Sequence, residues 1–297
     1  MRILVTGAGG QLGRELAVLL DAAPTHDVVA VDHRTCDVSD RDAVLATVAS
    51  VAPDAVVHCA AWTAVDDCEA DSDRAFAVNA LACRHVAEAA RRFDAHVIGV
   101  STDYVFDGTK DGPYHEWDEP CPRSVYGASK LAGERELLVG CPGASVVRTS
   151  WVCGLHGPNM VKTILRLAGD HDVLRFVDDQ VGHPTFTADA APALLELALA
   201  RESGIWHLTN RGAVSWYSFA REVLAAAGDD PDRVQPIATT QLDPPRPAPR
   251  PANSVLANAR WAASGRAPLD DFRVPLRRLV AELSGGAQAP NASRSSR

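Results

Sequence analysis

Blocks of hydrophobic and polar positions alternate over the first half of the chain. Short apolar runs predict strands at 2–6, 28–31, 55–58, 95–100 and 145–149. Amphipathic stretches predict helices at 11–21, 41–51, 72–93 and 124–138. Continuous apolar strands that alternate with helices are typical of a parallel sheet covered on both faces. The pattern therefore predicts an α/β fold, a Rossmann-type doubly wound parallel sheet.

The regularity weakens after residue 150, where helices are expected near 158–169, 187–201 and 215–227. The proline-rich segment 243–251 is expected to be extended and to lie on the surface. The pattern divides the chain into a first domain, a smaller C-terminal α/β lobe and a disordered tail, over 1–150, 151–283 and 284–297. Later segments can return to the first domain.

Composition narrows the kind of protein. Hydrophobic residues make up 46% of the chain and charged residues 23%, which is ordinary for a globular protein. The net charge of −9 argues against a nucleic acid polymer or an anionic membrane as partner. No apolar run approaches the ~18 residues of a membrane span, and a first strand at Arg2 leaves no room for a signal peptide. Seven cysteines without a C-x-x-C pair favour reduced thiols. We therefore expect a cytoplasmic protein without a metal site.

A glycine cluster follows the first predicted strand and opens the first predicted helix. Gly7, Gly10 and Gly13 form the spacing G-x-x-G-x-x-G, with Leu12 at the third glycine position of the usual G-x-G-x-x-G. Glycine permits a tight turn, close approach of a pyrophosphate and close packing of helix on sheet. The helix N-terminus then offers free N–H groups to the phosphates. The cluster predicts dinucleotide binding.

Acidic and basic residues after the second predicted strand bear on which dinucleotide binds. Asp32 stands 19 residues after Gly13, where a carboxylate would bind the ribose hydroxyls of the adenosine, as in NADH. Arg34 could instead hold the 2′-phosphate of NADPH, so both cofactors stay open. Asp37 and Val38 could flank the adenine, and helix capping is the alternative for Asp37.

A tyrosine and a lysine lie one helical turn apart in the predicted helix 124–138. The i, i+4 spacing of Tyr126 and Lys130 places both side chains on one face. A phenol has a pKa near ~10, and a nearby ammonium lowers it and makes proton transfer easier. Ser101 and Thr102 end the fourth predicted strand and supply a hydroxyl. These residues are suited to protonating the oxygen of a ketone that receives a hydride.

Together these features resemble the extended branch of the short-chain dehydrogenase/reductase superfamily. The resemblance implies that Tyr126 donates the proton and that Lys130 lowers its pKa and binds the nicotinamide ribose. It also implies that Thr102 polarises the substrate carbonyl, with Ser101 as second choice.

A closer resemblance, to the dTDP-4-dehydrorhamnose reductase family, covers about 250 residues and leaves only the tail outside. It rests on an ordered set of segments: GAGGQLG (7–13), CAAWTAVDDCE (59–69), VNA (78–80), STDYVFDG (101–108), VYGASKLAGE (125–134), RTSWV (148–152), DDQVGHPT (178–185), WYSFA (216–220) and RPANSVL (250–256). The family reduces the C4 ketone of dTDP-4-dehydro-L-rhamnose to dTDP-L-rhamnose with NAD(P)H, the last step of dTDP-rhamnose biosynthesis for cell wall polysaccharides. The resemblance implies that this chain catalyses the same reaction. A homodimer is possible, and the oligomeric state stays open.

The resemblance also assigns binding residues. It implies pyrophosphate contacts from the backbone of Gly10, Gln11 and Leu12, and cofactor contacts from Ala61, Trp62 and Thr63. Thr102, Asp103, Tyr126 and Trp151 would line the sugar-nucleotide site. Core packing is the alternative for Trp62, and packing between domains is the alternative for Trp151. The substrate diphosphate needs cations, and the candidates are Arg148, Lys162, Arg166 and Arg250. A surface charge is the favoured alternative for each of them except Arg250, whose proline-rich loop suggests a fixed position.

Two other readings fit part of the pattern. A sugar-nucleotide epimerase, or another sugar ketoreductase, could share Tyr126 and Lys130, but an epimerase recycles its cofactor and needs a further acid or base. The segment DYVFDG shows no obvious second acid or base beside the tyrosine. The regulatory subunit of methionine adenosyltransferase is a similar protein without catalysis and keeps the same glycines, tyrosine and lysine. The reductase is therefore the favoured reading.

Overall fold

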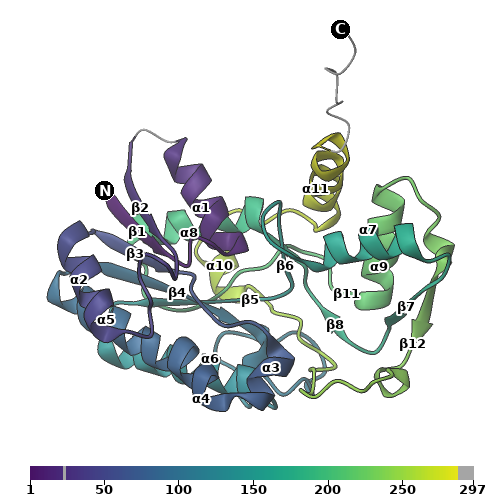
Figure 1. Cartoon of the computed structure of the whole chain (residues 1–297), viewed down its shortest axis with the longest axis horizontal. Helices are drawn as coiled ribbons and strands as arrows, with labels where there is room; N and C mark the ends of the chain where they lie inside the picture. The colour runs from purple at the N-terminus through teal and green to yellow at the C-terminus, as the bar shows by residue number, and fades with distance from the viewer. Residues whose placement is uncertain (23–24, 287–297) are drawn as a thin grey trace, which may run out of the picture.

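A six-stranded parallel sheet forms the centre of the larger lobe (Figure 1). The computed structural model describes residues 1–22 and 25–286. Along the sheet the strands are β10 (Gly204–His207), β5 (Ser145–Thr149), β4 (His96–Thr102), β3 (Ala55–His58), β1 (Arg2–Thr6) and β2 (Asp27–Val31). Every neighbouring pair is parallel. The predicted doubly wound α/β fold is confirmed, and the strand order reverses direction between β1 and β3.

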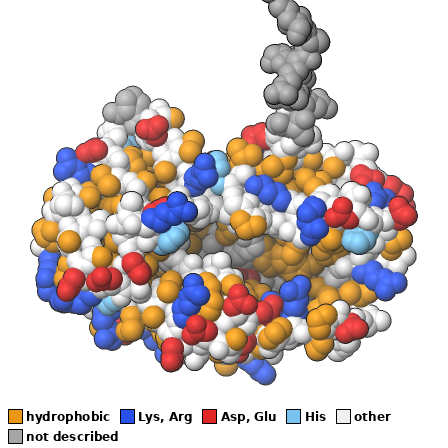
Figure 2. Space-filling model, in the orientation of Figure 1, with side chains coloured by type: hydrophobic (Ala, Val, Ile, Leu, Met, Phe, Trp, Pro, Cys, Tyr) orange, Lys and Arg blue, Asp and Glu red, His pale blue; other side chains and the backbone are white. Residues whose placement is uncertain are grey.

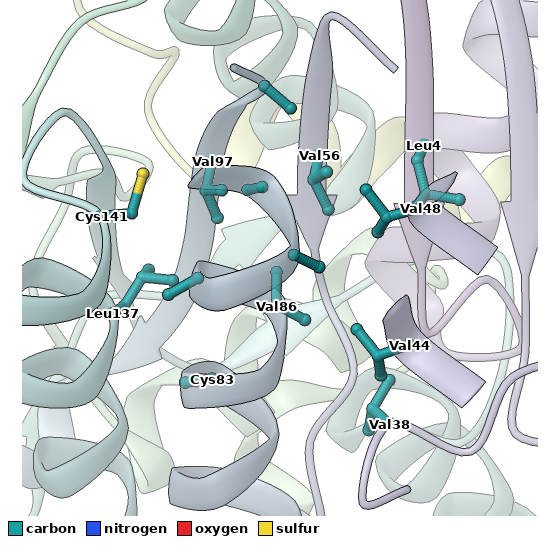
Figure 3. Close-up of a cluster of buried hydrophobic side chains, with 14 of the residues drawn as sticks. Leu4, Val38, Val44, Val48, Val56, Cys83, Val86, Val97, Leu137 and Cys141 are labelled. Atoms are coloured by element: carbon teal, nitrogen blue, oxygen red, sulfur yellow. The ribbon is translucent and has the colours of Figure 1, made fainter. Parts of the chain in front are cut away.

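Alternate residues of the strands pack into two separate cores, which explains why the strands are apolar throughout. On β1, Leu4 packs into one core, and its neighbours Ile3 and Val5 pack into the other. The same alternation separates Val56 from Val57 on β3. Figure 3 shows the first of these cores, where Leu4, Val56 and Val97 point from the strands toward the helices.

The helices form one layer on each face of the sheet. The first core lies under α2 (Arg41–Val51), α5 (Ala82–Arg92) and α6 (Val125–Gly140). The second lies under α1 (Gln11–Asp21) and α8 (Thr187–Ala200), which pack against each other. The short helix α10 (Ala259–Ala263) adds Trp261 to the second core.

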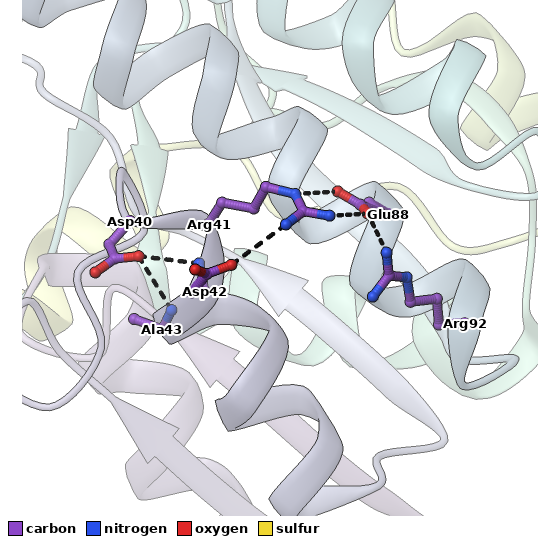
Figure 4. Close-up of polar contacts among 6 residues, drawn as sticks. All are labelled: Asp40, Arg41, Asp42, Ala43, Glu88 and Arg92. Carbon is purple, nitrogen blue, oxygen red and sulfur yellow. Dashed lines mark hydrogen bonds and ion pairs between the residues drawn. The ribbon is translucent and has the colours of Figure 1, made fainter.

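Polar contacts fix helices α2 and α5 relative to each other (Figure 4). The Asp40 carboxylate caps α2 by accepting hydrogen bonds from the N–H groups of Asp42 (2.9 Å) and Ala43 (3.2 Å). Arg41 makes a two-pronged ion pair with Glu88 on α5, through Nε (2.8 Å) and Nη2 (2.5 Å). Asp40, rather than Asp37, is therefore the capping residue of this helix.

The predicted helix 72–93 is interrupted. It consists of α4 (Ser72–Phe76), a π-helical turn (Ala77–Leu81) and α5, and the short helix α3 (Val65–Ala70) precedes it. A π-turn inserts an extra residue, which a 3.6-residue hydrophobic period cannot predict, and such turns are frequent at functional sites. Here the turn carries Asn79, whose side chain is buried.

The C-terminal lobe lies beside the sheet and has its own core (Figure 1). Its helices are α7 (Met160–Asp170), α9 (Trp216–Ala226) and α11 (Arg273–Gly286). Its strands form three pairs: β6 (Val152–Cys153) with β9 (Thr185–Phe186), β7 (Leu174–Val177) with β12 (Val234–Ile237), and β8 (Val181–Gly182) with β11 (Val214–Ser215). The helices predicted near 158–169, 187–201 and 215–227 are α7, α8 and α9.

Several segments after residue 150 lie on the first domain, since α8 and α10 pack on the sheet and β10 forms its edge. Residues 284–286, which were assigned to the tail, belong to α11, and residues 287–297 lie outside the described residues. All seven cysteines are free thiols. Within 1–22 and 25–286, no helix is long and apolar enough to cross a membrane, and no cluster of His, Cys, Asp or Glu could hold a metal ion.

Candidate active site

The glycine turn joins β1 to α1 beside the point where the strand order reverses. Gly7 has φ +71°, and a Cβ there would lie 2.5 Å from the backbone nitrogen of Ala60. A Cβ on Gly13 would lie 2.3 Å from the Gly7 carbonyl oxygen, so both positions need glycine. Gly10 is the N-cap of α1, and Gln11 begins the helix. Its first turn offers N–H groups to an anion at the crevice where doubly wound sheets bind ligands.

Asp32 stands beside this turn, directly after β2. A Cβ on Gly9 would lie 3.6 Å from the Asp32 Cβ. The carboxylate accepts hydrogen bonds from the N–H groups of Arg34 (3.0 Å) and Thr35 (3.2 Å), and the bond from Arg34 is the largest cause of its lowered pKa. The group is therefore ionised at neutral pH. Arg34 is exposed in the same turn, so both candidate determinants of the cofactor lie together.

The next loop is held from both sides. The exposed Asp37 carboxylate accepts hydrogen bonds from the Ser39 hydroxyl (2.7 Å) and N–H (2.9 Å), which lower its pKa. The side chain of Val38 packs in the first core, as Figure 3 shows. An adenine beside this loop would therefore meet Asp37 and the backbone of Val38, while the Val38 side chain anchors the loop.

The loop after β3 contains Ala61, Trp62 and Thr63, and the buried Asn79 holds it in place. The Trp62 N–H donates to Asn79 Oδ1 (2.8 Å), and Asn79 Nδ2 donates to the Trp62 carbonyl (3.1 Å). The half-buried indole packs with Tyr126 and carries the Arg74 guanidinium 4.5 Å above its ring. Trp62 thus has a packing role next to the candidate tyrosine. Sequence reasoning assigned no role to Asn79, although it noted the segment VNA.

Tyr126 lies at the start of α6, where its position is well fixed. Ser124 caps the helix by accepting a hydrogen bond from the Gly127 N–H (3.1 Å), and Glu69 accepts one from the Val125 N–H (2.8 Å). The Tyr126 ring meets Tyr104 edge-on, with centroids 5.5 Å apart. Burial raises the pKa of the Tyr126 phenol, and the nearby Thr102 hydroxyl opposes that effect. The phenol is therefore protonated at neutral pH.

Strand alternation decides between the two hydroxyls that end β4. The Thr102 hydroxyl lies beside Tyr126, donates to Asp103 Oδ1 (3.0 Å) and accepts from the Tyr104 N–H (3.2 Å). The Ser101 hydroxyl donates instead to Glu134 (2.5 Å). Thr102, the first choice from the sequence, is the hydroxyl that meets the tyrosine.

Lys130 lies one turn beyond Tyr126 on α6. Its Nζ donates to the Val100 carbonyl (2.7 Å), and burial lowers its pKa. Tyr126, Lys130 and Glu134 are spaced by four residues, and all three side chains meet β4. The predicted lowering of the Tyr126 pKa by Lys130 stays a prediction, because burial and the Thr102 hydroxyl are the largest influences on that pKa in this structure.

Glu134 and Arg148 form an ion pair deep in the protein. The guanidinium donates to the carboxylate through Nε (2.9 Å) and Nη2 (2.7 Å), and the two side chains are only 1% and 3% exposed. Both interpretations of Arg148 from the sequence, a diphosphate contact and a surface charge, are therefore wrong, because its charge is buried and paired.

The other three candidate cations are also engaged. Lys162 donates to the carbonyls of Leu155 (2.7 Å) and Gly157 (2.9 Å), and Arg166 pairs with Asp170 on the surface. Arg250 makes a two-pronged pair with Asp66 on α3, with Nη2 2.7 Å from Oδ2. This pair ties the proline-rich segment to the first domain, so the segment is anchored and its Ala248 is buried.

Asp103 is a buried carboxyl group beside Thr102. It is 2% exposed, and among the described residues no hydrogen bond reaches its Oδ2. Burial raises its pKa to about 6, and the nearby hydroxyls of Ser254 and Thr102 oppose that effect. Ser254 comes from the segment RPANSVL, which the sequence analysis noted without assigning this serine a role.

Asp103→Asn should stabilise the protein near pH 7.5 and change its stability little near pH 4. The folded pKa of about 6 lies above the ordinary 3.8, so the fold favours the protonated carboxyl. The wild type therefore loses stability as pH rises from about 4 to about 6 and does not regain it above that window. The neutral amide avoids this loss of up to about 3 kcal/mol. Urea unfolding at both pH values measures the difference, and an equal change at both would contradict the assignment.

Trp151 follows β5 and leads directly into β6, where the carboxyl end of the sheet meets the C-terminal lobe (Figure 1). Its half-buried indole stacks on Trp216 of α9, with ring centroids 3.6 Å apart. The packing that was considered as its alternative role is present. Figure 2 shows a hollow between the two lobes on this face, with hydrophobic side chains gathered on the side of the C-terminal lobe.

Comparisons with known proteins agree with this geometry. Residues 1–284 match the family described as RmlD substrate binding domain. A dTDP-4-dehydrorhamnose reductase of Streptomyces griseus is 45% identical over 97% of this chain and 96% of its own. A probable dTDP-4,6-dihydroxy-2-methyloxan-3-one 4-ketoreductase of Streptomyces antibioticus is 42% identical over 98% of both chains.

A solved structure extends the comparison. The dTDP-4-dehydrorhamnose reductase of Bacillus anthracis, in complex with NADP, has a TM-score of 0.90 and 33% identity, over 95% of this chain and 99% of that one. The glycine turn, the buried tyrosine and the second lobe of the present chain thus lie on a fold that near relatives share over their full length. The chain belongs to the RmlD substrate binding domain family.

Proposed function

We propose that this protein reduces the C4 ketone of dTDP-4-dehydro-L-rhamnose to dTDP-L-rhamnose with NADPH or NADH, in the cytoplasm, as the last step of dTDP-rhamnose biosynthesis. The observation that carries the proposal is the buried Tyr126 phenol, which lies beside the Thr102 hydroxyl at the carboxyl end of β4. Near relatives named as this reductase support the choice of substrate.

The residues around the glycine turn fit a nicotinamide dinucleotide. The free N–H groups at Gln11, Leu12 and Gly13 suit a pyrophosphate, and the tight fits of Gly7 and Gly13 keep side chains out of the turn. Asp32 suits a ribose, Asp37 and Val38 an adenine, and the loop Ala61, Trp62, Thr63 the nicotinamide end. When bound, the reduced cofactor supplies the hydride for the ketone carbon.

Side chains of this protein supply the proton and set the protonation state of the donor. Tyr126 gives its phenolic proton to the ketone oxygen as the C–O double bond becomes a single bond. The Thr102 hydroxyl, which donates to Asp103 in this structure, turns its one proton to the same oxygen when the substrate is bound. Burial keeps the phenol protonated until then. Lys130, one turn along α6, stabilises the phenolate that remains and binds the nicotinamide ribose, and a proton from solvent restores the phenol.

The sugar nucleotide is placed where the two lobes meet. In the proposal, this position is lined by Thr102, Asp103, Tyr126 and Trp151. Asp103 Oδ2 accepts a hydrogen bond from a hydroxyl of the sugar, because a buried oxygen without a partner is costly. The dTDP-sugar is the partner that we propose, and a homodimer stays a prediction.

A related ketoreductase or epimerase is the second candidate. The Streptomyces antibioticus relative is named for a different dTDP-linked ketone, and Asp103 is a titratable group next to Thr102 and Tyr126. An acid at this place suits either enzyme, so cofactor stoichiometry must separate the two. A reductase consumes its cofactor, and an epimerase restores it.

The experiment is an assay of NADPH and NADH oxidation with dTDP-4-dehydro-L-rhamnose, with the 4-keto-6-deoxy-D-glucose isomer for comparison. We expect one cofactor oxidised per sugar and a clear preference for the L-sugar. Sugar conversion without net cofactor loss would point to an epimerase. A preference for the D-isomer would assign another ketoreductase, and inertness despite cofactor binding would favour a regulatory subunit.

Asp32→Asn should shift cofactor preference toward NADPH. The ionised Asp32 carboxylate repels a 2′-phosphate and accepts a hydrogen bond from a 2′-hydroxyl, and Arg34 attracts the phosphate from the same turn. We expect the ratio of kcat/KM for NADPH over NADH to rise at least about 10-fold. Steady-state kinetics with both cofactors measure it, and Asp37→Asn is the control on the neighbouring loop. An unchanged ratio would place the ribose elsewhere.

A further inference from the structure

The backbone of Trp151 is strained, and the surrounding residues must hold it. Its φ is +46°, in the left-handed region that bulky residues rarely adopt. Residues in such conformations cluster at functional sites and persist only where neighbouring groups fix them. The question is which part of the fold fixes this one.

The aromatic contacts of the Trp151 indole come from the C-terminal lobe. Trp216, the first residue of α9, stacks on it with the rings 8° from parallel, and Phe219 meets both indoles edge-on, at 6.3 Å and 6.0 Å between centroids. On β8, a Cβ on Gly182 would lie 2.8 Å from the indole. The Thr185 N–H on β9 donates to the Trp151 carbonyl (3.2 Å).

The start of α9 is itself locked to β8. Ser215 caps α9 by accepting a hydrogen bond from the Ser218 N–H (3.1 Å), and its hydroxyl donates to Asp178 (2.5 Å). In the β8–β11 pair, Val214 stands opposite Gly182. The two groups that contact the Trp151 indole, on α9 and β8, are thus held in one rigid unit.

A short series of contacts joins this unit to the tyrosine. A Cβ on Gly182 would lie 2.7 Å from the Ser254 hydroxyl, and that hydroxyl lies near the Asp103 carboxyl group, whose pKa it lowers. Asp103 in turn bonds Thr102, whose hydroxyl lies beside Tyr126. The sheet register agrees, because Thr149, two residues before Trp151, stands opposite Thr102. Trp151 therefore lies on the substrate side of the reacting groups.

We propose that Trp216 is a positioning residue, through which the C-terminal lobe holds the Trp151 indole against the sugar nucleotide. The inference rests on the proposed function and assigns Trp216 a specific part in it. Loss of the stacked indole leaves the strained backbone of Trp151 without its largest contact, so Trp151 relaxes away from the substrate. The cofactor binds at the glycine turn, outside this unit, so its affinity is unaffected.

The test compares the two ligands in Trp216→Ala. We expect kcat/KM for the dTDP-sugar to fall at least about 10-fold, mainly through KM, while the Kd of NADPH changes less than about 2-fold. Trp216→Phe keeps an aromatic face and should recover most of the loss. Val280→Ala is the matched control: Val280 is buried in the same core, so its truncation should lower the Tm and leave the KM of the sugar unchanged.

A spectroscopic measurement keeps the proposal testable apart from catalysis. Two stacked indoles couple their transitions and contribute an exciton couplet to the circular dichroism spectrum. Trp216→Ala and Trp151→Phe should remove this contribution and leave that of the Trp206–Trp261 pair, and Trp117→Ala, at an exposed tryptophan, should retain both. Calorimetry with dTDP-L-rhamnose measures the affinity of the protein for the sugar nucleotide even if no reduction occurs. The comparison of wild type with Trp216→Ala therefore tests the proposal even if the reductase assignment fails. An unchanged sugar affinity in Trp216→Ala, an equal loss of NADPH affinity, or a wild type without the couplet would overturn the proposal.

Discussion

Replacing Tyr126 by phenylalanine should lower kcat for the dTDP-sugar at least about 100-fold, the usual scale of general acid catalysis. The variant lacks the only atom that the mechanism uses to protonate the ketone oxygen. The ring remains, so its edge contact with Tyr104 and its place at the start of α6 are retained. Stopped-flow kinetics with saturating NADPH measure the rate, and the Kd of NADPH should stay close to that of the wild type.

Tyr114→Phe is the matched control for this variant. It removes a phenolic hydroxyl that donates to Asp107 (2.7 Å), from a tyrosine that is 4% exposed, but leaves the proposed proton donor in place. We expect its kcat to stay within about threefold of the wild type, whatever it costs in stability. A Tyr126→Phe variant that keeps more than about a tenth of the wild-type rate would exclude the phenol as the proton donor.

Glu134→Leu should destabilise the protein by about 3–5 kcal/mol, because it leaves the guanidinium of Arg148 buried without a counter-charge. The pair is almost inaccessible to water, and Nη1 of Arg148 has no other partner among the described residues. The change also removes the acceptor of the Ser101 hydroxyl. Urea unfolding measures the free energy.

Two further variants define what this loss means. Glu136 lies on the same helix as Glu134 and makes an ion pair with Arg84 of α5. Both side chains are partly exposed, at 58% for Arg84 and 29% for Glu136, so we expect Glu136→Ala to cost less than about 1 kcal/mol. The double change Glu134→Leu with Arg148→Met replaces the buried pair by apolar groups and should restore most of the stability. If Glu134→Leu costs no more than Glu136→Ala, the pair is not buried as described.

The first half of the fold could be predicted because its elements are long and regular. Strands such as β1 and β3 are apolar at every position, since alternate residues face two cores, and the helices between them carry clear amphipathic patterns. The π-turn at Asn79 could not be predicted, because one extra residue does not disturb the hydrophobic period enough. In the C-terminal lobe, strands of two residues such as β8 and β11 have no period to detect.

Some residues of the candidate site could likewise be predicted from the local sequence, and others could not. The glycine turn and the pair Tyr126 and Lys130 follow from local spacing and local chemistry. The choice of Thr102 over Ser101 needs the position of Glu134, 33 residues from Ser101. The partners of Asp103 and Trp151, which are Ser254 and Trp216, come from distant segments whose meeting depends on the whole fold.

The central claim is that hydride reaches C4 of the sugar while Tyr126 protonates its oxygen. The most direct measurement uses NADPH deuterated at the transferable position of the nicotinamide, with nuclear magnetic resonance of the product. The account predicts one deuterium at C4 of dTDP-L-rhamnose for each cofactor oxidised. Tyr126→Phe should place deuterium at the same carbon and at no other, but at a much lower rate. A product without deuterium, or with deuterium at another carbon, would contradict it.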